Sequence, residues 1–257
     1  MNYQLTIGWL YPELMSTYGD RGNIFILKKR CEWRGIKCEI IPIDFSTKND
    51  ELITMNLFFG GGAQDRQQSL LISDLRKRVG PIMKEMIDDG TPGLFVCGSP
   101  QLLGHSYMTG DGTVLQGLGI FDMVTKHFGY DKPRCIGNMV VETSSKYQVS
   151  GIKYRKTIVG FENHGGRTYL GKSAKPFGKV IIGKGNNGED KTEGAVYKNC
   201  IATYSHGPFL SKNPHIADWL ISRALKQKYH KTIRLQKLDD SLEWKAHDYM
   251  LKRLDVK

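Results

Sequence analysis

The chain has 257 residues, of which 40% are hydrophobic, and its 37 lysines and arginines against 26 aspartates and glutamates give a formal net charge of +11. This length suits one large domain or a domain with an extension; no apolar run is long enough to cross a bilayer, and we expect no signal peptide. The five cysteines are an odd number without a CxxC pair, which argues against a disulfide framework or a zinc site and favours a reducing, cytoplasmic compartment.

Strands and helices alternate along the first hundred residues. Apolar segments rich in β-branched residues, bounded by turn formers, predict the strands, and amphipathic segments that end at glycines predict the helices. This alternation predicts an α/β fold with a mostly parallel central sheet. The expected strands are residues 3–10, 37–43, 55–59 and 93–96, and the expected helices are residues 24–34, 64–79 and 81–90, with a further helix after Cys97.

The character of the chain changes after Gly104. Spaced glycines and short apolar segments predict a β-rich second half, with strands at residues 138–143, 157–161, 180–182 and 200–204. An amphipathic helix is expected at residues 214–227, starting at Pro214. We therefore predict a domain over residues 1–228 and a basic C-terminal extension over residues 229–257, with a helix at 241–254.

Cys97 follows directly on the expected strand 93–96. Gly98 allows a tight turn, Ser99 suits a helix N-cap, and Pro100 suits the first helical position. Cys97 is thus expected where a strand ends and a helix begins, so that helix N–H groups point toward its sulfur and favour a thiolate. A nucleophile and a buried structural cysteine both fit this position, because free cysteine is among the most buried residue types.

A cysteine nucleophile needs a base, and histidine is the usual one. His206 is the best placed, because it follows the expected strand 200–204, and parallel strands end at the same edge of a sheet. His164, in a glycine-flanked segment after another strand, is the alternative. We expect the other histidines at the surface: His105, His127, His215, His230 and His247.

Three consecutive glycines, Gly60, Gly61 and Gly62, follow the expected strand 55–59. Such a segment can turn its N–H groups inward and stabilise an oxyanion, with the N–H of Gly98 as a second donor. An ordinary flexible loop is the alternative. The segment matches neither GxxxxGK[ST] nor GxGxxG, so a phosphate-binding loop is not expected.

Together these residues resemble class I (triad-type) glutamine amidotransferase domains of the cobyric-acid-synthase-like branch. Within that branch they resemble the glutaminase subunits of lipid II isoglutaminyl synthases, which amidate peptidoglycan stem peptides. The resemblance covers about residues 5 to 228 and implies a three-layer, flavodoxin-like fold. It is carried by residues 18–23 (YGDRGN), 59–62 (FGGG) with Asp65 and Arg66, 96–104 (VCGSPQLLG), and 160–168 (GFENHGGRT) with 203–208 (TYSHGP).

The resemblance also implies roles for individual residues. Cys97 would attack the side-chain amide of L-glutamine, and His206 would act as base and then as acid toward the leaving ammonia. Backbone N–H groups near Gly61 and Gly98 would hold the oxyanion. Arg134 would bind the glutamine α-carboxylate, for which an arginine fork is suited; without the resemblance, Arg134 is equally compatible with a surface arginine.

The chain departs from the class I pattern at two places. Most class I domains carry a glutamate two residues after the histidine, where this chain has Pro208; the cobyric-acid-like branch lacks that glutamate as well. The third triad member is then expected from a partner subunit, or the site is a dyad. Ser99 and Pro100 stand where the family commonly has glycine and an aromatic residue, which narrows the room beside Cys97.

The function implied by the resemblance is that of a glutaminase subunit whose ammonia passes to a separate Mur-ligase-like synthetase subunit. That partner, in a heterodimer, would amidate the D-glutamate α-carboxylate of lipid II. The chain shows no ATP-binding motif, so we expect no cofactor or metal here, and ATP and Mg on the partner. We expect the membrane surface as a partner through lipid II.

Two other functions stay open. One is a stand-alone cysteine hydrolase of γ-glutamyl compounds, which would use the same cysteine and histidine. The other is a non-catalytic adaptor with a basic surface. We expect no nucleic-acid partner, because the positive charge is spread along the chain and the aromatic and glycine pattern of an RNA-binding sheet is missing.

Overall fold

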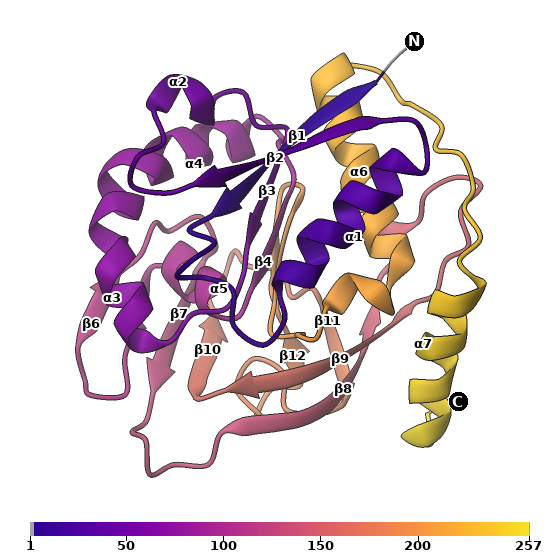
Figure 1. Ribbon diagram of the computed structural model, residues 1–257. Helices are drawn as coiled ribbons and strands as arrows, with labels where there is room; N and C mark the ends of the chain where they lie inside the picture. Colours follow the sequence, from indigo (N-terminus) through magenta and orange to yellow (C-terminus); the bar gives the residue numbers. More distant parts are fainter. Residues whose placement is uncertain (1–2, 257) are drawn as a thin grey trace.

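The buried strands of the first hundred residues lie side by side in a central six-stranded sheet (Figure 1). The computed structural model describes residues 3–256. The strand order is β13-β14-β4-β3-β1-β2, and every neighbouring pair is parallel except β13 with β14. This confirms the predicted α/β class and the mostly parallel sheet. The strands are β1 (Gln4–Leu10), β2 (Lys37–Ile43), β3 (Leu57–Gly60), β4 (Gly93–Val96), β13 (Ala195–Tyr197) and β14 (Cys200–Thr203).

Helices cover both faces of this sheet, which makes three layers (Figure 1). Successive strand residues alternate between two apolar clusters: Leu94 and Val96 pack toward α1 and α6, whereas Phe95 packs toward α3, α4 and α5. Strands buried on both faces consist of continuous apolar residues, as β3 and β4 do. The helices are α1 (Arg21–Glu32), α2 (Asn49–Leu52), α3 (Asp65–Asp74), α4 (Gly80–Asp88), α5 (Gly98–Leu103) and α6 (Pro214–Tyr229).

The chain runs from α3 to α4 through one π-helical segment, η1 (Leu75–Val79), with no break. The sequence predicts a new helix at Pro81. In the structure α4 begins one residue earlier, at Gly80, and Pro81 lies in its first turn.

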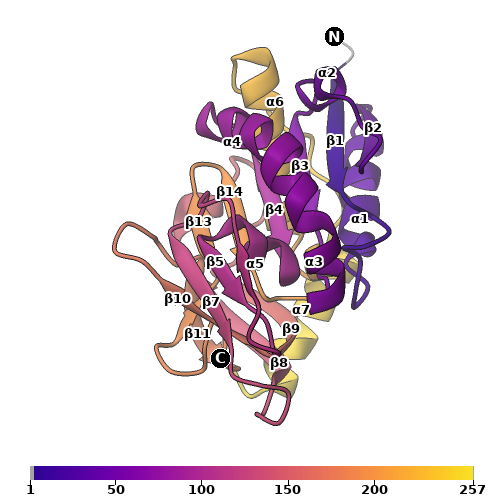
Figure 2. The ribbon, with the colours of Figure 1, turned by 90° about the vertical axis from the view of Figure 1, so that its left-hand side faces the viewer.

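The second half of the chain is rich in strands, as predicted, and these strands gather at the end of the central sheet away from the N-terminus (Figure 2). They form two four-stranded sheets, β10-β7-β5-β6 and β12-β11-β8-β9. Their bounds are β5 (Ser106–Met108), β6 (Val114–Gln116), β7 (Met123–His127), β8 (Cys135–Thr143), β9 (Thr157–His164), β10 (Gly166–Leu170), β11 (Gly178–Ile182) and β12 (Thr192–Glu193), with 3-10 turns η2 (Ser145–Tyr147) and η3 (Phe209–Ser211).

The predicted C-terminal helix is present as α7 (Ser241–Arg253), and it packs beside β9 (Figure 1). Its Trp244 is buried and stacks on His215 of α6, with ring centroids 5.3 Å apart. The division of the chain at residue 228 stays a prediction. No helix among the described residues is long and apolar enough to cross a membrane.

Three histidines expected at the surface are buried, which corrects that expectation. His215 lies between α6 and α7, and burial lowers its pKa to about 3. His247 of α7 contacts the Thr157 hydroxyl at 2.9 Å through Nε2, and His127 lines the cavity described below. These contacts come from distant parts of the chain, so the polar local sequence around each histidine is misleading.

Candidate active site

Cys97 lies at a sharp turn between β4 and α5. Its backbone angles, φ 53° and ψ −97°, fall in a region that residues other than glycine rarely adopt. Strained turns of this kind persist where the surrounding structure enforces them, and they cluster at functional sites. Its N–H donates to the Thr203 carbonyl of neighbouring β14 at 2.9 Å, and the side chain is 6% exposed. The predicted elbow between strand and helix is therefore confirmed as a conformation.

The N-cap of α5 is Cys97 and not Ser99, which corrects the sequence prediction. The helix begins two residues earlier, at Gly98, because the turn is completed by the positive φ of Cys97. Ser99 lies inside the helix, and its hydroxyl donates to the Gly61 carbonyl at 2.7 Å. Ser99 thus ties the elbow to the glycine segment that follows β3.

The glycine segment packs so closely on the elbow that side chains would not fit. A Cβ on Gly98 would lie 2.6 Å from the backbone nitrogen of Ala63, and one on Gly61 would lie 2.5 Å from the Met15 carbonyl. The N–H of Gly62 is already used, since it donates to the Asp20 carboxylate at 2.8 Å. Gly61 and Gly98 thus lie in neighbouring segments beside Cys97, and their role as oxyanion donors stays a prediction.

His206 follows β14 and reaches the same edge of the sheet as Cys97. It is buried, and its backbone N–H donates to the Phe161 carbonyl at 2.8 Å. Because β14 and β4 are parallel neighbours, their carboxyl ends meet. This arrangement agrees with the expectation that the two strand ends bring Cys97 and His206 together.

A buried aspartate holds the ring of His206. Nδ1 lies 3.0 Å and 3.1 Å from the two carboxylate oxygens of Asp20, so Nδ1 carries a proton and donates it. Nε2 is buried and, within residues 3–256, has no hydrogen bond of standard geometry. Burial alone would lower the pKa of His206, but the Asp20 charge and the nearby Cys97 sulfur raise it to about 10.

Asp20 is the site residue that reasoning from the sequence missed. The structure supplies a carboxylate to His206 from within the chain, which corrects the expectation of a partner's acid or a dyad. The two residues are 186 positions apart, and the class I pattern directs attention to residue 208. The sequence did contain one indication of Asp20. The YGDRGN segment follows β1, and β1 is parallel to the central strands, so the segment is expected at the same edge of the sheet. Pro208, which replaces the usual glutamate, packs where a side chain on Gly22 would lie.

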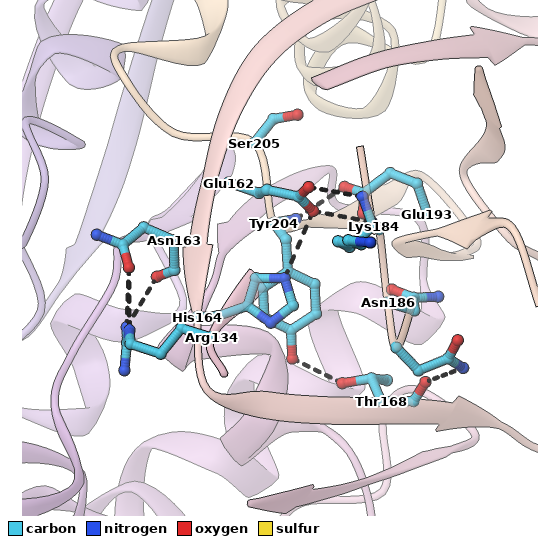
Figure 3. Close-up of polar contacts among 12 residues, drawn as sticks. Arg134, Glu162, Asn163, His164, Thr168, Lys184, Asn186, Glu193, Tyr204 and Ser205 are labelled. Atoms are coloured by element: carbon cyan, nitrogen blue, oxygen red, sulfur yellow. Dashed lines mark hydrogen bonds and ion pairs between the residues drawn. The ribbon is translucent and has the colours of Figure 1, made fainter. Parts of the chain in front are cut away.

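Cys97 opens into a cavity of about 290 Å³ at this edge, a volume at the low end of small-molecule sites. Arg134 reaches the same cavity from the loop before β8, which agrees with its expected position just before a strand. The side chain and carbonyl of Asn163 hold its guanidinium at 3.0–3.2 Å (Figure 3). A larger hollow of about 830 Å³ beside α7 contains none of the candidate residues.

His164, the alternative base, lines the cavity but has other partners. Its Nδ1 lies 2.8 Å from the Gly166 carbonyl, its Nε2 lies 3.8 Å from Glu162, and its ring stacks on Tyr204 (Figure 3). Burial lowers the pKa of His164 and favours the neutral ring. His206 is therefore the better candidate for a base that exchanges a proton with Cys97.

Two buried glutamates lie beside His164 and Tyr204 and hold backbone N–H groups (Figure 3). Glu162 accepts the N–H groups of Lys184 and Gly185 at 2.6 and 2.8 Å, and Glu193 accepts the Thr203 hydroxyl and a backbone N–H of the chain leaving β14. Burial raises the pKa of Glu193 to about 7. All five cysteines are free, and no cluster of three His, Cys, Asp or Glu side chains in residues 3–256 is arranged to hold a metal.

Comparisons with known proteins point to one family. A family model for CobB/CobQ-like glutamine amidotransferase domains matches residues 6–214. The chain is 42% identical over 226 residues to the lipid II isoglutaminyl synthase (glutamine-hydrolyzing) subunit GatD of Staphylococcus aureus (strain N315), covering 88% of this chain and 86% of that protein. It is 40% identical over 245 residues to the subunit of the same name in Streptococcus pneumoniae (strain ATCC BAA-255 / R6), covering 93% and 88%.

The fold is similar to solved structures as well. A crystal structure of a glutamine amidotransferase matches with a TM-score of 0.56 at 14% sequence identity, covering 85% of this chain and 98% of that one. At this level of identity the match shows the fold alone. It confirms the predicted glutamine amidotransferase architecture.

Proposed function

The chain belongs to the CobB/CobQ-like glutamine amidotransferase family, and on this basis we propose that it is the glutaminase subunit of a lipid II isoglutaminyl synthase. The relatives that carry that name match about nine-tenths of the chain at 40–42% identity. One observation carries the proposal at the level of the site: Cys97 sits on a strained elbow beside a histidine that a buried aspartate orients.

The proposed reaction begins when the sulfur of Cys97, whose proton is held by Nε2 of His206, attacks the side-chain amide carbon of L-glutamine. The negative charge that develops on the amide oxygen is held by backbone N–H groups near Gly61 and Gly98. Asp20 keeps the proton of His206 on Nδ1, which leaves Nε2 to exchange a proton with the reacting groups. Because the pKa of His206 is raised to about 10, the ring is protonated near neutral pH and can donate to the leaving ammonia.

The second half of the reaction releases glutamate. A water molecule attacks the glutamyl thioester on Cys97, with Nε2 of His206 accepting its proton, and the sulfur leaves as the thiolate, so that His206 is again protonated for the next cycle. Throughout the cycle, Arg134 holds the α-carboxylate of the substrate. Its guanidinium is already oriented by Asn163, which reduces the entropy lost on binding.

The ammonia passes, in this proposal, to a Mur-ligase-like synthetase subunit that binds ATP and Mg and amidates the D-glutamate α-carboxylate of lipid II. Two observations support a partner: the relatives are named as subunits, and the sequence has no ATP-binding motif. The heterodimer would act in the cytoplasm and meet the membrane surface through lipid II. It would need no nucleic acid.

Stable-isotope labelling tests this proposal. The chain, co-purified with a Mur-ligase-like synthetase, is given lipid II, ATP and L-glutamine labelled with ¹⁵N in the side-chain amide. We expect ¹⁵N in the amide of the stem-peptide isoglutamine, and loss of that label with the Cys97→Ala chain while free ammonium still supports amidation. Label transfer that persists with Cys97→Ala would contradict the proposal.

A stand-alone hydrolase of γ-glutamyl compounds is the second candidate. The observation that favours it is Asp20, which completes a cysteine, histidine and aspartate set inside this chain. Glutamate release by the isolated chain at the rate of the co-purified complex would support it. A large increase in rate on adding the synthetase would support the subunit.

A further inference from the structure

Opposite charges line the cavity beside Cys97: Asp65 carries a negative charge, and Arg66 and Arg134 carry positive charges. The ion pairs formed among residues 3–256 include neither Asp65 nor Arg134, so these two side chains do not neutralise each other or any neighbour. Asp65 is half-buried and Arg134 is exposed, so water solvates both charges until a ligand that carries the opposite charges displaces it.

Neutral donors hold the Asp65 carboxylate in place. Oδ1 accepts the Tyr107 hydroxyl at 2.6 Å, and Oδ2 accepts the Gly110 N–H at 2.9 Å and the Tyr130 hydroxyl at 2.8 Å. A carboxylate has room for about four hydrogen bonds. These three donors fix its position without cancelling its charge, and they leave one acceptor site for a ligand.

Arg134 is held in the matching way. Its Nε and Nη2 donate to Asn163, a neutral residue, and its charge is not cancelled (Figure 3). A pocket that presents one fixed anion, one fixed cation and a candidate nucleophile is complementary to a free α-amino acid. Its ammonium, its carboxylate and its side chain would each meet one of the three groups.

We propose that Asp65 binds the α-ammonium group of the substrate, so that the site selects free, zwitterionic L-glutamine over des-amino and N-acylated analogues. This inference rests on the proposed glutaminase function and adds a specificity-determining residue to it. The α-ammonium forms a charge-assisted hydrogen bond to the open acceptor site of Asp65. Glutamine within a peptide has no such group, so peptides are poor substrates.

A purely structural role for Asp65 is the competing explanation. Tyr130 lies on the same loop as Arg134, between β7 and β8, so its bond to Asp65 also fastens that loop. If fastening were the whole role, loss of Asp65 would weaken every ligand of the cavity equally. Tyr130→Phe removes the fastening hydroxyl and keeps the charge, which separates the two explanations.

The test is equilibrium binding of L-glutamine and of glutaramate, which lacks only the amino group, measured by isothermal titration calorimetry. The full chain carrying Cys97→Ala serves as the non-hydrolysing parent. We expect the parent to prefer L-glutamine by about 10-fold or more, the size of one hydrogen bond to a charged group. Adding Asp65→Asn should bring the preference to within about threefold, by weakening L-glutamine and leaving glutaramate nearly unchanged.

Two further variants serve as controls. Asp111→Asn, a change to an exposed carboxylate in the β5–β6 loop that does not border the cavity, should keep the parent's affinity for both ligands. Tyr130→Phe, which removes one of the three donors to Asp65 and loosens the loop, should weaken both ligands alike and keep the preference. Equal weakening of both ligands by Asp65→Asn, or an unchanged preference, overturns the role of Asp65. Failure of the parent to bind L-glutamine overturns this role and the glutaminase together. If the preference for L-glutamine depends on Asp65 but the chain with Cys97 intact releases no glutamate, the role of Asp65 stands and the glutaminase function is overturned.

Discussion

At the scale of single residues, the pair Asp20 and His206 determines the chemistry available at the site. Both side chains are buried, and the carboxylate accepts the Nδ1 proton at 3.0 Å. A histidine held in this way has a defined tautomer and a raised pKa, here about 10. The rest of the site depends on this contact, because Asp20 also accepts the N–H of Gly62 in the glycine segment.

Asp20→Asn is therefore expected to lower kcat for glutamate release by about 10²- to 10⁴-fold, since the amide holds the wrong tautomer or none. A matched change of an exposed carboxylate, Asp50→Asn in α2, should leave kcat within about twofold. Steady-state kinetics of both variants, with circular dichroism to confirm folding, check this. Equal activity in Asp20→Asn and Asp50→Asn would show that Asp20 does not orient His206 for catalysis.

The same pair predicts a dependence of stability on pH. The pKa of His206 is higher in the folded chain than the ordinary value of 6.5, so the folded state holds a proton that the unfolded state releases above that value. Its contribution is fully present below pH 6.5 and is lost as the pH rises toward 10. Urea unfolding from pH 6 to 10 should show a steeper loss for the wild type than for Asp20→Asn, and parallel curves would contradict the raised pKa.

Reasoning from the sequence identified some site residues and missed others for physical reasons. Cys97 and His206 each follow an apolar strand, so local sequence alone placed both at strand ends. Asp20 contributes through a contact across 186 positions, which no local pattern encodes. Asp65 was noted only as part of a motif. The groups that hold its carboxylate, the hydroxyls of Tyr107 on β5 and Tyr130 on the β7–β8 loop, are distant in the sequence.

At the scale of elements, the β4–α5 elbow and the glycine segment after β3 form one unit. The segment fits because Gly98 has no side chain, and Ser99 bonds across to Gly61 at 2.7 Å. The sequence predicted both elements and their boundary to within a residue or two. It did not predict their contact, which depends on β3 and β4 being neighbours.

Gly98→Ala tests this contact. The new Cβ would lie 2.6 Å from the backbone nitrogen of Ala63, so one of the two segments must move. We expect kcat to fall at least about 10-fold, because displacement of an oxyanion donor costs about that much or more, whereas KM for L-glutamine changes little. Ser99→Ala, which removes only the hydrogen bond, should have a smaller effect of the same kind. An unchanged kcat in Gly98→Ala would contradict the proposed donor.

The strands β5, β6 and β7 were not predicted, because they are too short to be recognised from the sequence. They have three to five residues each, too few for alternation to separate a strand from a turn. Longer strands such as β8 and β9 were predicted, although only in part. Tertiary pairing between segments determines the short ones, and sequence periodicity does not report it.

At the scale of the whole molecule, a buried charge network fastens the C-terminal segment to the domain. Arg30 of α1 bonds Asp218 of α6 at 2.8 Å and Asp240, just before α7, at 2.7 Å. Arg30 donates twice to Asp218, and Arg34 adds a third hydrogen bond to it. The sequence predicted a helix at 241–254, but not that it would pack through Arg30 and Trp244.

Arg30→Met should therefore destabilise the chain by about 3–5 kcal/mol, because it leaves a carboxylate buried without its main partner. Lys29→Met is the matched control: it removes the neighbouring, exposed pair with Glu32 and should change the free energy of unfolding by less than about 1 kcal/mol. Urea unfolding of both variants measures this difference. Similar values for the two would mean that the network contributes little to stability.

Glutamate release by Cys97→Ala is the decisive measurement for Cys97 as the nucleophile of a glutaminase. The control is Cys38→Ala, which removes another buried cysteine, on β2 and away from the cavity. Both are assayed alone and with the synthetase subunit. We expect a loss of about 10³-fold or more for Cys97→Ala and a rate within about twofold of wild type for Cys38→Ala. Undiminished glutamate release by Cys97→Ala would show that Cys97 is not the nucleophile.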